Sequence, residues 1–266
     1  MPTVADNVAM WDRWYDWPAG GEEWSAAWGG SEAQWRGTIL PRIDPLLPAS
    51  TILEIAPGFG RWTHYLRGHC DRLVLVDLSP RCIDACRERF AGDDRIEYHV
   101  NDGRSLRAVE DASVDFVFSY DSLVHAEADV LASYVRELAR VLAASGAAFV
   151  HHSNAGEYRR TYEAVRRGPR ALRARLVERG WLDRLHRRAL SVSAESFRAS
   201  CERAGLRCLT QELVNWGGRR LIDCFSTVVP AAAAARPTTV VRNPRFMDEA
   251  ASVRARHEPV NAETSG

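Results

Sequence analysis

The residues best suited to chemistry are acidic side chains at the ends of short apolar runs. Glu54 lies in TILEI, Asp77 ends LVLVD, and Asp102 follows IEYHVN. Runs of this kind, rich in β-branched residues, are typical of buried strands. In an open parallel sheet, ligands bind at the carboxyl edge of the strands, so the residues that end the strands are the ones to examine. We therefore expect the three carboxylates to lie at one binding site.

A glycine-containing turn, APGFG, follows the first of these runs. Gly58 and Gly60 carry no side chain, so the backbone can approach a ligand closely there. A carboxylate at Asp77, where the second run ends, can accept hydrogen bonds from both hydroxyls of a ribose. Asp102 and Gly103 end the third run, where a carboxylate can accept hydrogens from an adenine amino group. The pattern predicts a cofactor that contains a nucleoside.

Two cofactors suit a ribose carboxylate beside a glycine turn: a nicotinamide dinucleotide and S-adenosylmethionine. The dinucleotide fingerprint G-x-G-x-x-G/A requires a small residue at its sixth position, where helix and strand pack closely. Counted from Ala56, that position is Arg61. An arginine there could still contact a phosphate, but its bulk disfavours the dinucleotide.

The elements that must position these residues alternate between strand and helix from residue 51 onward. Strand-like runs at TILEI, RLVLVD, IEYHV, VDFVFS and GAAFVHHS are separated by helical stretches. This alternation predicts an α/β fold with a doubly wound, mostly parallel sheet and helices on both faces. Two later runs, RCLTQELVNW and RLIDCFSTVV, predict an antiparallel C-terminal hairpin. Helices are also expected on both sides of Gly168-Pro169 and between a capping Ser193 and a terminating Gly205.

Four segments in order, LEIAPGFGRWT, LVLVDLS, YHVNDGRSL and VDFVFSYDSLVHAE, resemble the motifs of class I S-adenosylmethionine-dependent methyltransferases. The resemblance covers residues 50–155, and the hairpin is similar to the antiparallel end of that family's seven-stranded Rossmann-like sheet. That family usually has glycine where this chain has Ala56. The resemblance implies that Glu54, Ala56, Gly58 and Gly60 line the methionine part of the cofactor, Asp77 and Leu78 hold the ribose, and Asp102 and Gly103 hold the adenine.

His125 is the predicted catalytic residue. It lies in SYDSLVHAEAD, which follows the fourth strand at the rim of the expected site. The ordinary pKa of histidine suits a general base, and a hydroxyl acceptor needs one because an alcohol is a poor nucleophile until its proton is removed. Asp121 could orient the imidazole. The alternative is a structural histidine that caps the following helix.

Two further histidines, His151 and His152, end the fifth strand. Strand alternation sends the two side chains to opposite faces, so we expect one of them to reach the acceptor pocket together with Asn154. Because histidines and carboxylates converge near this edge, a divalent ion such as magnesium could hold two hydroxyls of the acceptor. Magnesium prefers oxygen ligands, however, so the metal is left undecided.

Six of the nine tryptophans fall within the first 35 residues. They form two trios at helical spacing, Trp11, Trp14 and Trp17, and Trp24, Trp28 and Trp35. Such faces can stack on sugar rings and exclude water, or they can simply pack helices against the sheet. With Asn215 and Trp216 arriving from the hairpin, we favour a sugar-bearing acceptor. The sequence also resembles bacterial O-methyltransferases that modify sugars and small molecules.

The predicted organisation has three parts. Residues 1–48 form a tryptophan-rich helical lid, and residues 49–230 form the methyltransferase domain, with a helical arginine-rich insertion at about 157–190. Residues 231–266 form an extension with a mobile end, its last ~15 residues.

The insertion raises an alternative function. It carries 11 arginines between Arg159 and Arg188 against three acidic residues, and it could contact RNA or another anionic substrate, or be a solvated helical face. Another alternative is a Rossmann-like nucleotide-binding protein without catalysis.

The composition sets the remaining expectations. All 35 basic residues are arginine and are balanced by 35 acidic ones, so no net charge favours nucleic acid. The six cysteines show no CxxC spacing, which predicts reduced thiols. No leader or membrane-spanning run is apparent, so we expect a cytoplasmic protein, and a homodimer is expected from base rates for soluble enzymes.

Overall fold

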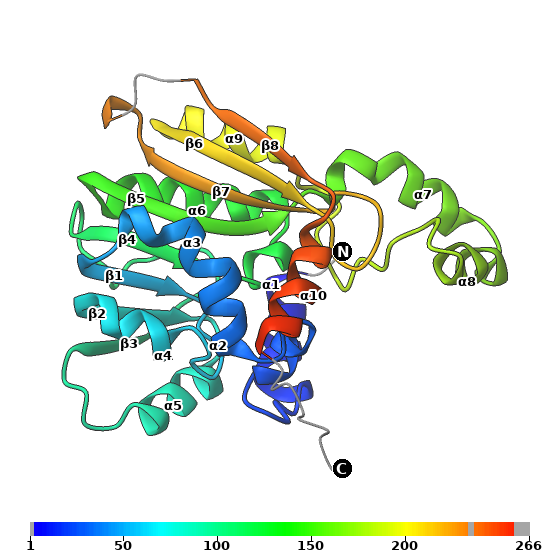
Figure 1. Ribbon diagram of the computed structural model, residues 1–266. Helices are drawn as coiled ribbons and strands as arrows, with labels where there is room; N and C mark the ends of the chain where they lie inside the picture. The colour runs from blue at the N-terminus through cyan, green and yellow to red at the C-terminus, as the bar shows by residue number, and fades with distance from the viewer. Residues whose placement is uncertain (1–2, 234–236, 258–266) are drawn as a thin grey trace, which may run out of the picture.

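The computed structural model describes residues 3–233 and 237–257, and its centre is an eight-stranded sheet (Figure 1). The strands are β1 (Ala49–Ile55), β2 (Cys70–Asp77), β3 (Ile96–Val100), β4 (Val114–Ser119), β5 (Leu142–Ser153), β6 (Leu206–Val214), β7 (Asp223–Pro230) and β8 (Thr239–Asn243). Their order across the sheet is β3-β2-β1-β4-β5-β7-β6-β8. Strands β1 to β5 pair in parallel, and β7 is antiparallel to both β5 and β6. The predicted mostly parallel, doubly wound sheet with an antiparallel hairpin is confirmed.

Helices cover both faces of this sheet. They are α1 (Val4–Val8), α2 (Ser31–Gln34), α3 (Leu40–Ile43), α4 (Thr63–Leu66), α5 (Pro80–Arg89), α6 (Ala128–Val141), α7 (Arg159–Arg167), α8 (Arg170–Glu178), α9 (Ala194–Arg203) and α10 (Phe246–His257). Short turns of 3-10 or π type span Ala9–Trp14, Glu22–Trp28, Trp35–Ile39, Asp44–Leu46, Arg67–His69, Leu123–His125, Ala155–Tyr158 and Ala231–Ala233. Helices α6 and α9 cover one face, and the segments from Trp28 to Ile43 cover the other together with α4, α5 and α10.

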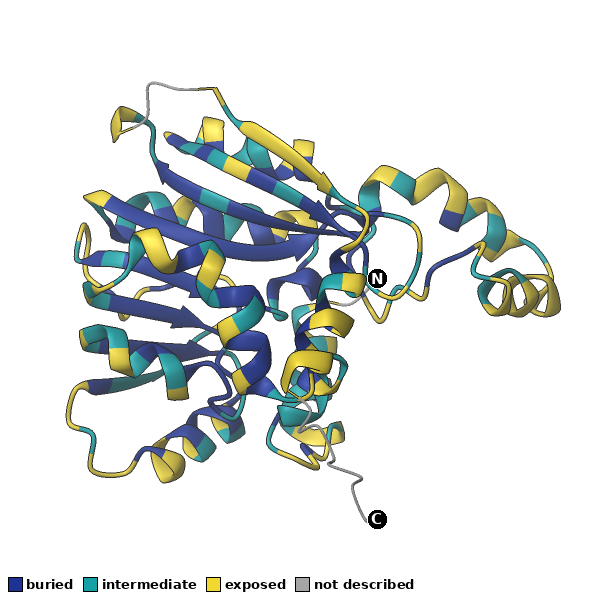
Figure 2. Cartoon of the chain, in the orientation of Figure 1, coloured by how far each residue is buried: buried dark blue, intermediate teal, exposed yellow. Residues whose placement is uncertain are grey.

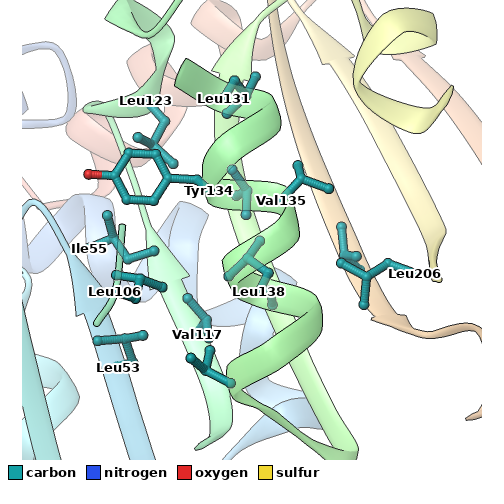
Figure 3. Close-up of a cluster of buried hydrophobic side chains, with 14 of the residues drawn as sticks. Leu53, Ile55, Leu106, Val117, Leu123, Leu131, Tyr134, Val135, Leu138 and Leu206 are labelled. Atoms are coloured by element: carbon teal, nitrogen blue, oxygen red, sulfur yellow. The ribbon is translucent and has the colours of Figure 1, made fainter. Parts of the chain in front are cut away.

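The core is a direct consequence of strand and helix periodicity. In β1, Leu53 and Ile55 point to the α6 face and Ile52 points to the opposite face. Helix α6 presents buried side chains three and four residues apart, including Leu131, Val135 and Leu138, to the first of these faces (Figure 3). Each such side chain stabilises the fold by ~1.5–3 kcal/mol when fully buried. The parallel strands thereby acquire a fixed register, and their carboxyl ends meet at one edge.

The C-terminal extension is more ordered than the sequence suggested. Strand β8 adds an eighth strand beside β6, parallel to it, so the sheet gains one strand over the predicted seven. Helix α10 then buries Phe246, Ala250 and Val253 in the core. These residues supply an apolar face within a segment whose alanine and arginine content obscured it. The predicted mobile end falls partly on α10, and residues 258–266 lie outside the described part of the chain.

The arginine-rich insertion forms an arm that projects from the body (Figure 1). As predicted, Gly168-Pro169 separates its two helices, α7 and α8. Tyr162 is the one buried residue of α7, and α8 has none, so most of the arm is exposed (Figure 2). The next helix, α9, begins at a capping box formed by Ser193 and ends before Gly205, which has a φ of 79°. These boundaries are confirmed.

Candidate active site

A pocket lies at the carboxyl edge of the parallel strands, and the N-terminal segment covers it. Six of the predicted site residues line its wall: Ala56, Gly58, Asp77, Leu78, Gly103 and His125. The lining also contains aromatic side chains from four segments, namely Trp11, Trp17, Trp24, Phe59, Trp62, Tyr120 and Tyr134. The predicted cofactor loop and the predicted base therefore share one pocket.

The loop after β1 has a backbone that glycine permits. Ala56, Gly58 and Gly60 have φ values of 60°, 58° and 81°. Ala56 thus keeps the left-handed conformation that glycine adopts without strain, although it carries a side chain. At Gly58, an added Cβ would lie 2.7 Å from Cη2 of Trp17, so the N-terminal segment approaches the bare backbone closely.

Asp77 lies in this wall at the end of β2, as predicted. Its Oδ2 accepts a hydrogen bond from the Gly58 amide at 3.2 Å, and its Oδ1 accepts one from the Ser79 amide at 2.8 Å. Burial raises the pKa of Asp77 to about 6, against the lowering effect of these amides. The carboxylate is therefore held in a fixed orientation, with acceptor capacity left for a ligand.

Two of the predicted residues, Glu54 and Gly60, do not line the pocket. Glu54 is buried and accepts a hydrogen bond from the Thr63 hydroxyl at 2.5 Å. Burial raises the pKa of Glu54 to about 8. Gly60 packs against the end of α5, where an added Cβ would lie 2.5 Å from Cε2 of Phe90. In this structure both residues support the loop from behind.

Asp102 and Gly103 separate in the structure. Gly103 reaches the pocket, and an added Cβ would lie 2.9 Å from Cγ1 of Val4. Asp102 is exposed, and its Oδ1 accepts hydrogen bonds from the Arg104 and Ser105 amides. Burial acts to raise the pKa of this carboxyl, but these amides hold it below its usual range. The predicted contact of Asp102 with adenine is therefore not evident from its placement.

His125 is placed where a base could act. It is 9% exposed, and its ring lies 5.4 Å from that of Trp11. Nδ1 lies 3.3 Å from the carbonyl oxygen of Arg187, which can only accept, so Nδ1 carries the proton and Nε2 is free to accept one. Burial, with the nearby Arg188 charge, lowers the pKa of His125 to about 4, so the ring is neutral at pH 7. It does not cap α6, which begins after Glu127.

Asp121 does not orient His125 in the predicted way. Its carboxylate pairs with Arg61, at 3.4 Å between Oδ2 and the guanidinium, and its backbone amide donates to Nδ1 of His151 at 3.1 Å. Asp121 itself has a φ of 61°, which is unfavourable for a residue with a side chain. Arg61 is also buried, and it stacks on Trp62 at 4.4 Å. The arginine that disfavoured a dinucleotide is therefore part of the pocket wall.

The two histidines of β5 point to opposite faces, as strand alternation predicted. His152 stacks on Phe197 of α9 and lies 2.9 Å from the Ser226 hydroxyl, inside the core. His151 faces the other way and lies behind Asp121, but it is fully buried and does not line the pocket. The Asn154 side chain donates a hydrogen bond to the Leu221 carbonyl and does not line the pocket. The expectation that His151 or His152 reaches the acceptor with Asn154 is not met in this structure.

The tryptophans group differently from the two predicted trios. Trp11, Trp17 and Trp24 pack together over the pocket, with ring centroids 5.1–6.1 Å apart. Trp14 is 66% exposed, because the chain turns after the short helix that contains it. Trp28 and Trp35 lie in the core below. The N-terminal segment thus covers the pocket with one tryptophan cluster and anchors itself with another pair.

The acidic residues of the 121–129 loop diverge. Glu127 accepts a hydrogen bond from Ser191, and Asp129 pairs with Arg104 at 2.8 Å. Among the described residues, no group of three or more histidine, cysteine or acidic side chains is arranged to hold a metal. The convergence that suggested magnesium is not formed.

Sequence reasoning assigned no role to several aromatic residues of the pocket, among them Tyr120 and Trp62. Tyr120 is buried, and its hydroxyl accepts a hydrogen bond from Gln34 Nε2 at 3.2 Å. Trp62 follows the glycine loop directly and is buried beside it. Their position next to the strand ends of β1 and β4 was the available signal, since parallel strand ends converge.

The comparisons with known proteins concern the domain that carries this pocket. Residues 52–146 match the family described as "Methyltransferase domain". The fold is similar to N-methyltransferase NodS from Bradyrhizobium japonicum, at a TM-score of 0.52 and 18% identity over 73% of this chain and 94% of that one. It is also similar to the PH0226 protein of Pyrococcus horikoshii, at a TM-score of 0.51 and 20% identity over 75% of this chain and 93% of that one.

Curated relatives match over short stretches. An rRNA adenine N-6-methyltransferase of Streptomyces fradiae is 32% identical over 76 residues, which are 27% of this chain and 24% of that protein. A ribosomal RNA small subunit methyltransferase A of Geobacter metallireducens is 37% identical over 62 residues, 22% of each chain. The alignments thus span about a quarter of the length of these relatives.

The ordered motifs and the sheet topology agree with this family match, and the similar solved structures share the fold. The methyltransferase domain identified by the family match lies at residues 52–146.

The residues of the pocket fit S-adenosylmethionine, the methyl donor that the sequence resemblance implies. The wall offers a buried carboxylate with free acceptor capacity at Asp77, and a backbone at Gly58 and Gly103 with no side chain in the way. Leu78 adds an apolar surface beside Gly103: a Cβ added to Gly103 would lie 3.7 Å from the Cβ of Leu78. These residues would hold the donor, which supplies an electrophilic methyl group.

Proposed function

We propose that this protein transfers a methyl group from S-adenosylmethionine to a hydroxyl of a sugar or sugar-bearing small molecule. The observation that carries this proposal is His125, a neutral, buried imidazole in the same pocket as the donor loop. A hydroxyl acceptor requires a group that takes its proton as the new carbon–oxygen bond forms.

The chain's own residues perform three tasks in this mechanism. Asp77 and the loop around Gly58 hold the donor. His125 Nε2 receives the hydroxyl proton, while Nδ1 stays bonded to the Arg187 carbonyl. The aromatic cover excludes water, which strengthens the electrostatic interactions within the pocket.

The aromatic lining supports a sugar-bearing acceptor. Trp11 lies against the His125 ring, Trp24 presents ring surface in the same pocket, and Arg61 and Asp121 offer a donor and an acceptor for hydroxyls at its wall. Tryptophan rings stack on the C–H face of a sugar, and the polar groups at the edge fix its orientation.

The test is product analysis with labelled donor and a panel of glycosides, with and without magnesium. We expect a methyl ether on the glycoside, and loss of that product in His125→Asn. A product methylated on nitrogen, or an unchanged rate in the variant, would contradict hydroxyl transfer with His125 as base.

A second candidate is methylation of RNA, because the matched curated relatives act, by their names, on ribosomal RNA and because the arm is rich in arginine. Arg166, Arg167 and Arg173 lie on its exposed helices. Arginine contacts to phosphates make binding strongly dependent on salt. Methyl transfer to ribosomal RNA that falls steeply with salt, and that is lost when these arginines are replaced by glutamine, would favour this candidate over the glycoside.

A cofactor-binding protein without catalysis is the third candidate. It would bind the donor yet methylate neither glycosides nor RNA, and His125→Asn would leave donor binding unaffected.

For the sugar methyltransferase proposed first, we also propose a homodimer and a cytoplasmic location. No helix in the described residues is both long and apolar enough to cross a membrane.

A further inference from the structure

A buried ion pair lies beneath the pocket. The carboxylate of Asp223, the first residue of β7, accepts hydrogen bonds from Nε and one terminal nitrogen of Arg188 at 2.6 and 2.7 Å. Both side chains are almost fully buried. Burial alone would raise the pKa of Asp223, but the Arg188 guanidinium and His151 hold it well below its usual range. The pair is therefore charged, and its two-bond geometry fixes both partners.

One branch from this pair leads to His125. Arg188 follows Arg187, whose carbonyl oxygen contacts Nδ1 of His125. His186 and Arg187 have φ values of 43° and 65°, so two consecutive residues adopt a conformation unfavourable for side chains. Such a backbone persists only where its surroundings hold it in place. The Arg188 side chain supplies that anchor.

The other branch leads to Asp121. Nε2 of His151 lies 3.3 Å from Oδ2 of Asp223, a contact without hydrogen-bond geometry, and Nδ1 of His151 accepts the hydrogen bond from the Asp121 amide. Asp121 also has a positive φ and lies in the pocket wall. The positive-φ turn at residues 186–187 and the one at Asp121 are thus connected to the same carboxylate, through Arg188 and His151.

We propose that Asp223 is a positioning residue of the active site: through Arg188 it places the Arg187 carbonyl that selects the Nδ1-protonated form of His125, and through His151 it places Asp121. The proposal rests on the proposed function of His125 as base. Asp223 does not line the pocket.

The test replaces the carboxylate while conserving its shape. In Asp223→Asn the amide group cannot accept both Arg188 hydrogen bonds, so the 186–188 turn should relax. Nitrogen NMR of the imidazoles, with His125→Asn to assign the signal, reports which nitrogen of His125 carries the proton. We expect wild type to be protonated at Nδ1, and Asp223→Asn to show a mixture of the two forms. The kcat should fall on the order of ten- to a hundredfold with the donor Kd unchanged.

Arg188→Lys covers the case in which Asp223→Asn does not fold. It keeps the buried positive charge and loses the two-bond geometry, so the same change in the His125 signal is expected with smaller amplitude. The matched control is Asp183→Asn. Asp183 is equally buried and pairs with Arg220 at 3.0 Å in the same region, without contact to His125.

Unchanged protonation of His125 in folded Asp223→Asn or Arg188→Lys would overturn the proposal. An equal change in Asp183→Asn would overturn it as well, because it would show a general loss of order. The NMR measurement needs no acceptor. A failure of the base assignment, seen as full turnover in His125→Asn, is therefore distinguishable from a failure of the positioning role.

Discussion

At His125, one hydrogen bond decides which nitrogen can act as a base. The Arg187 carbonyl has no proton to give, so it selects the form of the ring that leaves Nε2 open. His125 and Arg187 are 62 residues apart in the sequence, so no local pattern around His125 could predict this contact. Burial keeps the same ring neutral throughout the physiological range, so Nε2 is unprotonated, and it also makes the ring a weaker base than an ordinary histidine.

Replacement of His125 should reduce the chemical step and leave donor binding intact. His125→Ala and His125→Asn are expected to lower kcat about a hundredfold or more, the range typical of a lost general base. Asparagine can still donate to the Arg187 carbonyl, so it separates the hydrogen bond from the base. Stopped assays with saturating donor measure kcat, and calorimetry measures the donor Kd. A weakened donor Kd in His125→Asn would show that the residue serves binding instead.

The pH dependence of kcat, measured with saturating donor so that the titration of Asp77 near pH 6 does not enter, gives a second test at this residue. Only the neutral ring can accept a proton, and burial lowers the pKa of His125 to about 4. The acid limb of the profile should therefore fall near pH 4 and not near 6.5, the ordinary pKa of histidine. Rates at several pH values, at constant ionic strength, will decide. A limb centred near 6.5 would contradict the neutral, buried state.

Ala56 shows what the sequence could and could not predict at the scale of one residue. The motif predicted a glycine-like turn, and the structure gives Ala56 a φ of 60°. Ala56→Gly should keep donor affinity, and it should change the free energy of unfolding by less than about 1 kcal/mol, because relief of strain is offset by the larger entropy of glycine in the unfolded chain. Thermal unfolding with and without donor measures both. A large loss of affinity would show that the methyl group itself contacts the donor.

At the scale of elements, the N-terminal segment and the loop after β1 act together. Trp17 lies on Gly58 and stacks on Phe59, at 4.5 Å between ring centroids. The Asp12 carboxylate accepts from the Ser79 hydroxyl at 2.8 Å, which ties the same segment to the end of β2. The cover is thus fastened at the residues expected to bind the donor.

Gly58→Ala tests this coupling. The new methyl group would overlap the Trp17 ring, so we expect a weaker donor Kd in addition to the backbone cost of about 1–2 kcal/mol at a positive φ. Gly92→Ala is the matched control, since Gly92 has a φ of 90° and nothing within 4 Å of an added Cβ. Unfolding should show the backbone cost alone in Gly92→Ala and at least that loss in Gly58→Ala, and calorimetry should show lost donor affinity in Gly58→Ala alone. Equal donor affinities in the two variants would show that the N-terminal segment over the pocket does not contribute to donor binding.

The elements themselves were largely predictable, whereas the contacts between distant segments were not. Alternating strands and helices, the break at Gly168-Pro169 and the capped start of α9 follow from local rules, and the structure confirms them. Strand β8 was missed because it is exposed, so its sequence carries no buried pattern. The grouping of Trp11, Trp17 and Trp24 was missed because a chain reversal, and not a helical face, brings them together.

At the scale of the whole molecule, charge is distributed unevenly although its sum is zero. The arm gathers arginines, while buried acids such as Glu54, Asp77 and Asp223 lie at the sheet edge. The stability of the protein must therefore depend on pH through its buried groups.

Glu54 should make a measurable contribution to this dependence. Burial raises the pKa of Glu54 in the folded state from its ordinary 4.5 to about 8. Its contribution to stability is thus fully present below pH 4.5 and is lost as pH rises toward 8, by up to about 1.4 kcal/mol per pH unit. Compared with Glu54→Gln by urea unfolding, wild type should lose free energy of unfolding across this window. Parallel curves for the two proteins would show that Glu54 is ionised when folded.

The central claim is that this pocket binds S-adenosylmethionine through Asp77. Calorimetric titration of wild type, Asp77→Asn and Asp77→Ala with S-adenosylmethionine, and separately with NAD, tests it most directly. We predict binding of the methyl donor alone, weakened roughly tenfold to a hundredfold in Asp77→Ala, as expected when hydrogen bonds to a charged group are lost. Binding of NAD in place of the methyl donor, or undiminished affinity in Asp77→Ala, would contradict the assignment of the pocket and of the roles derived from it.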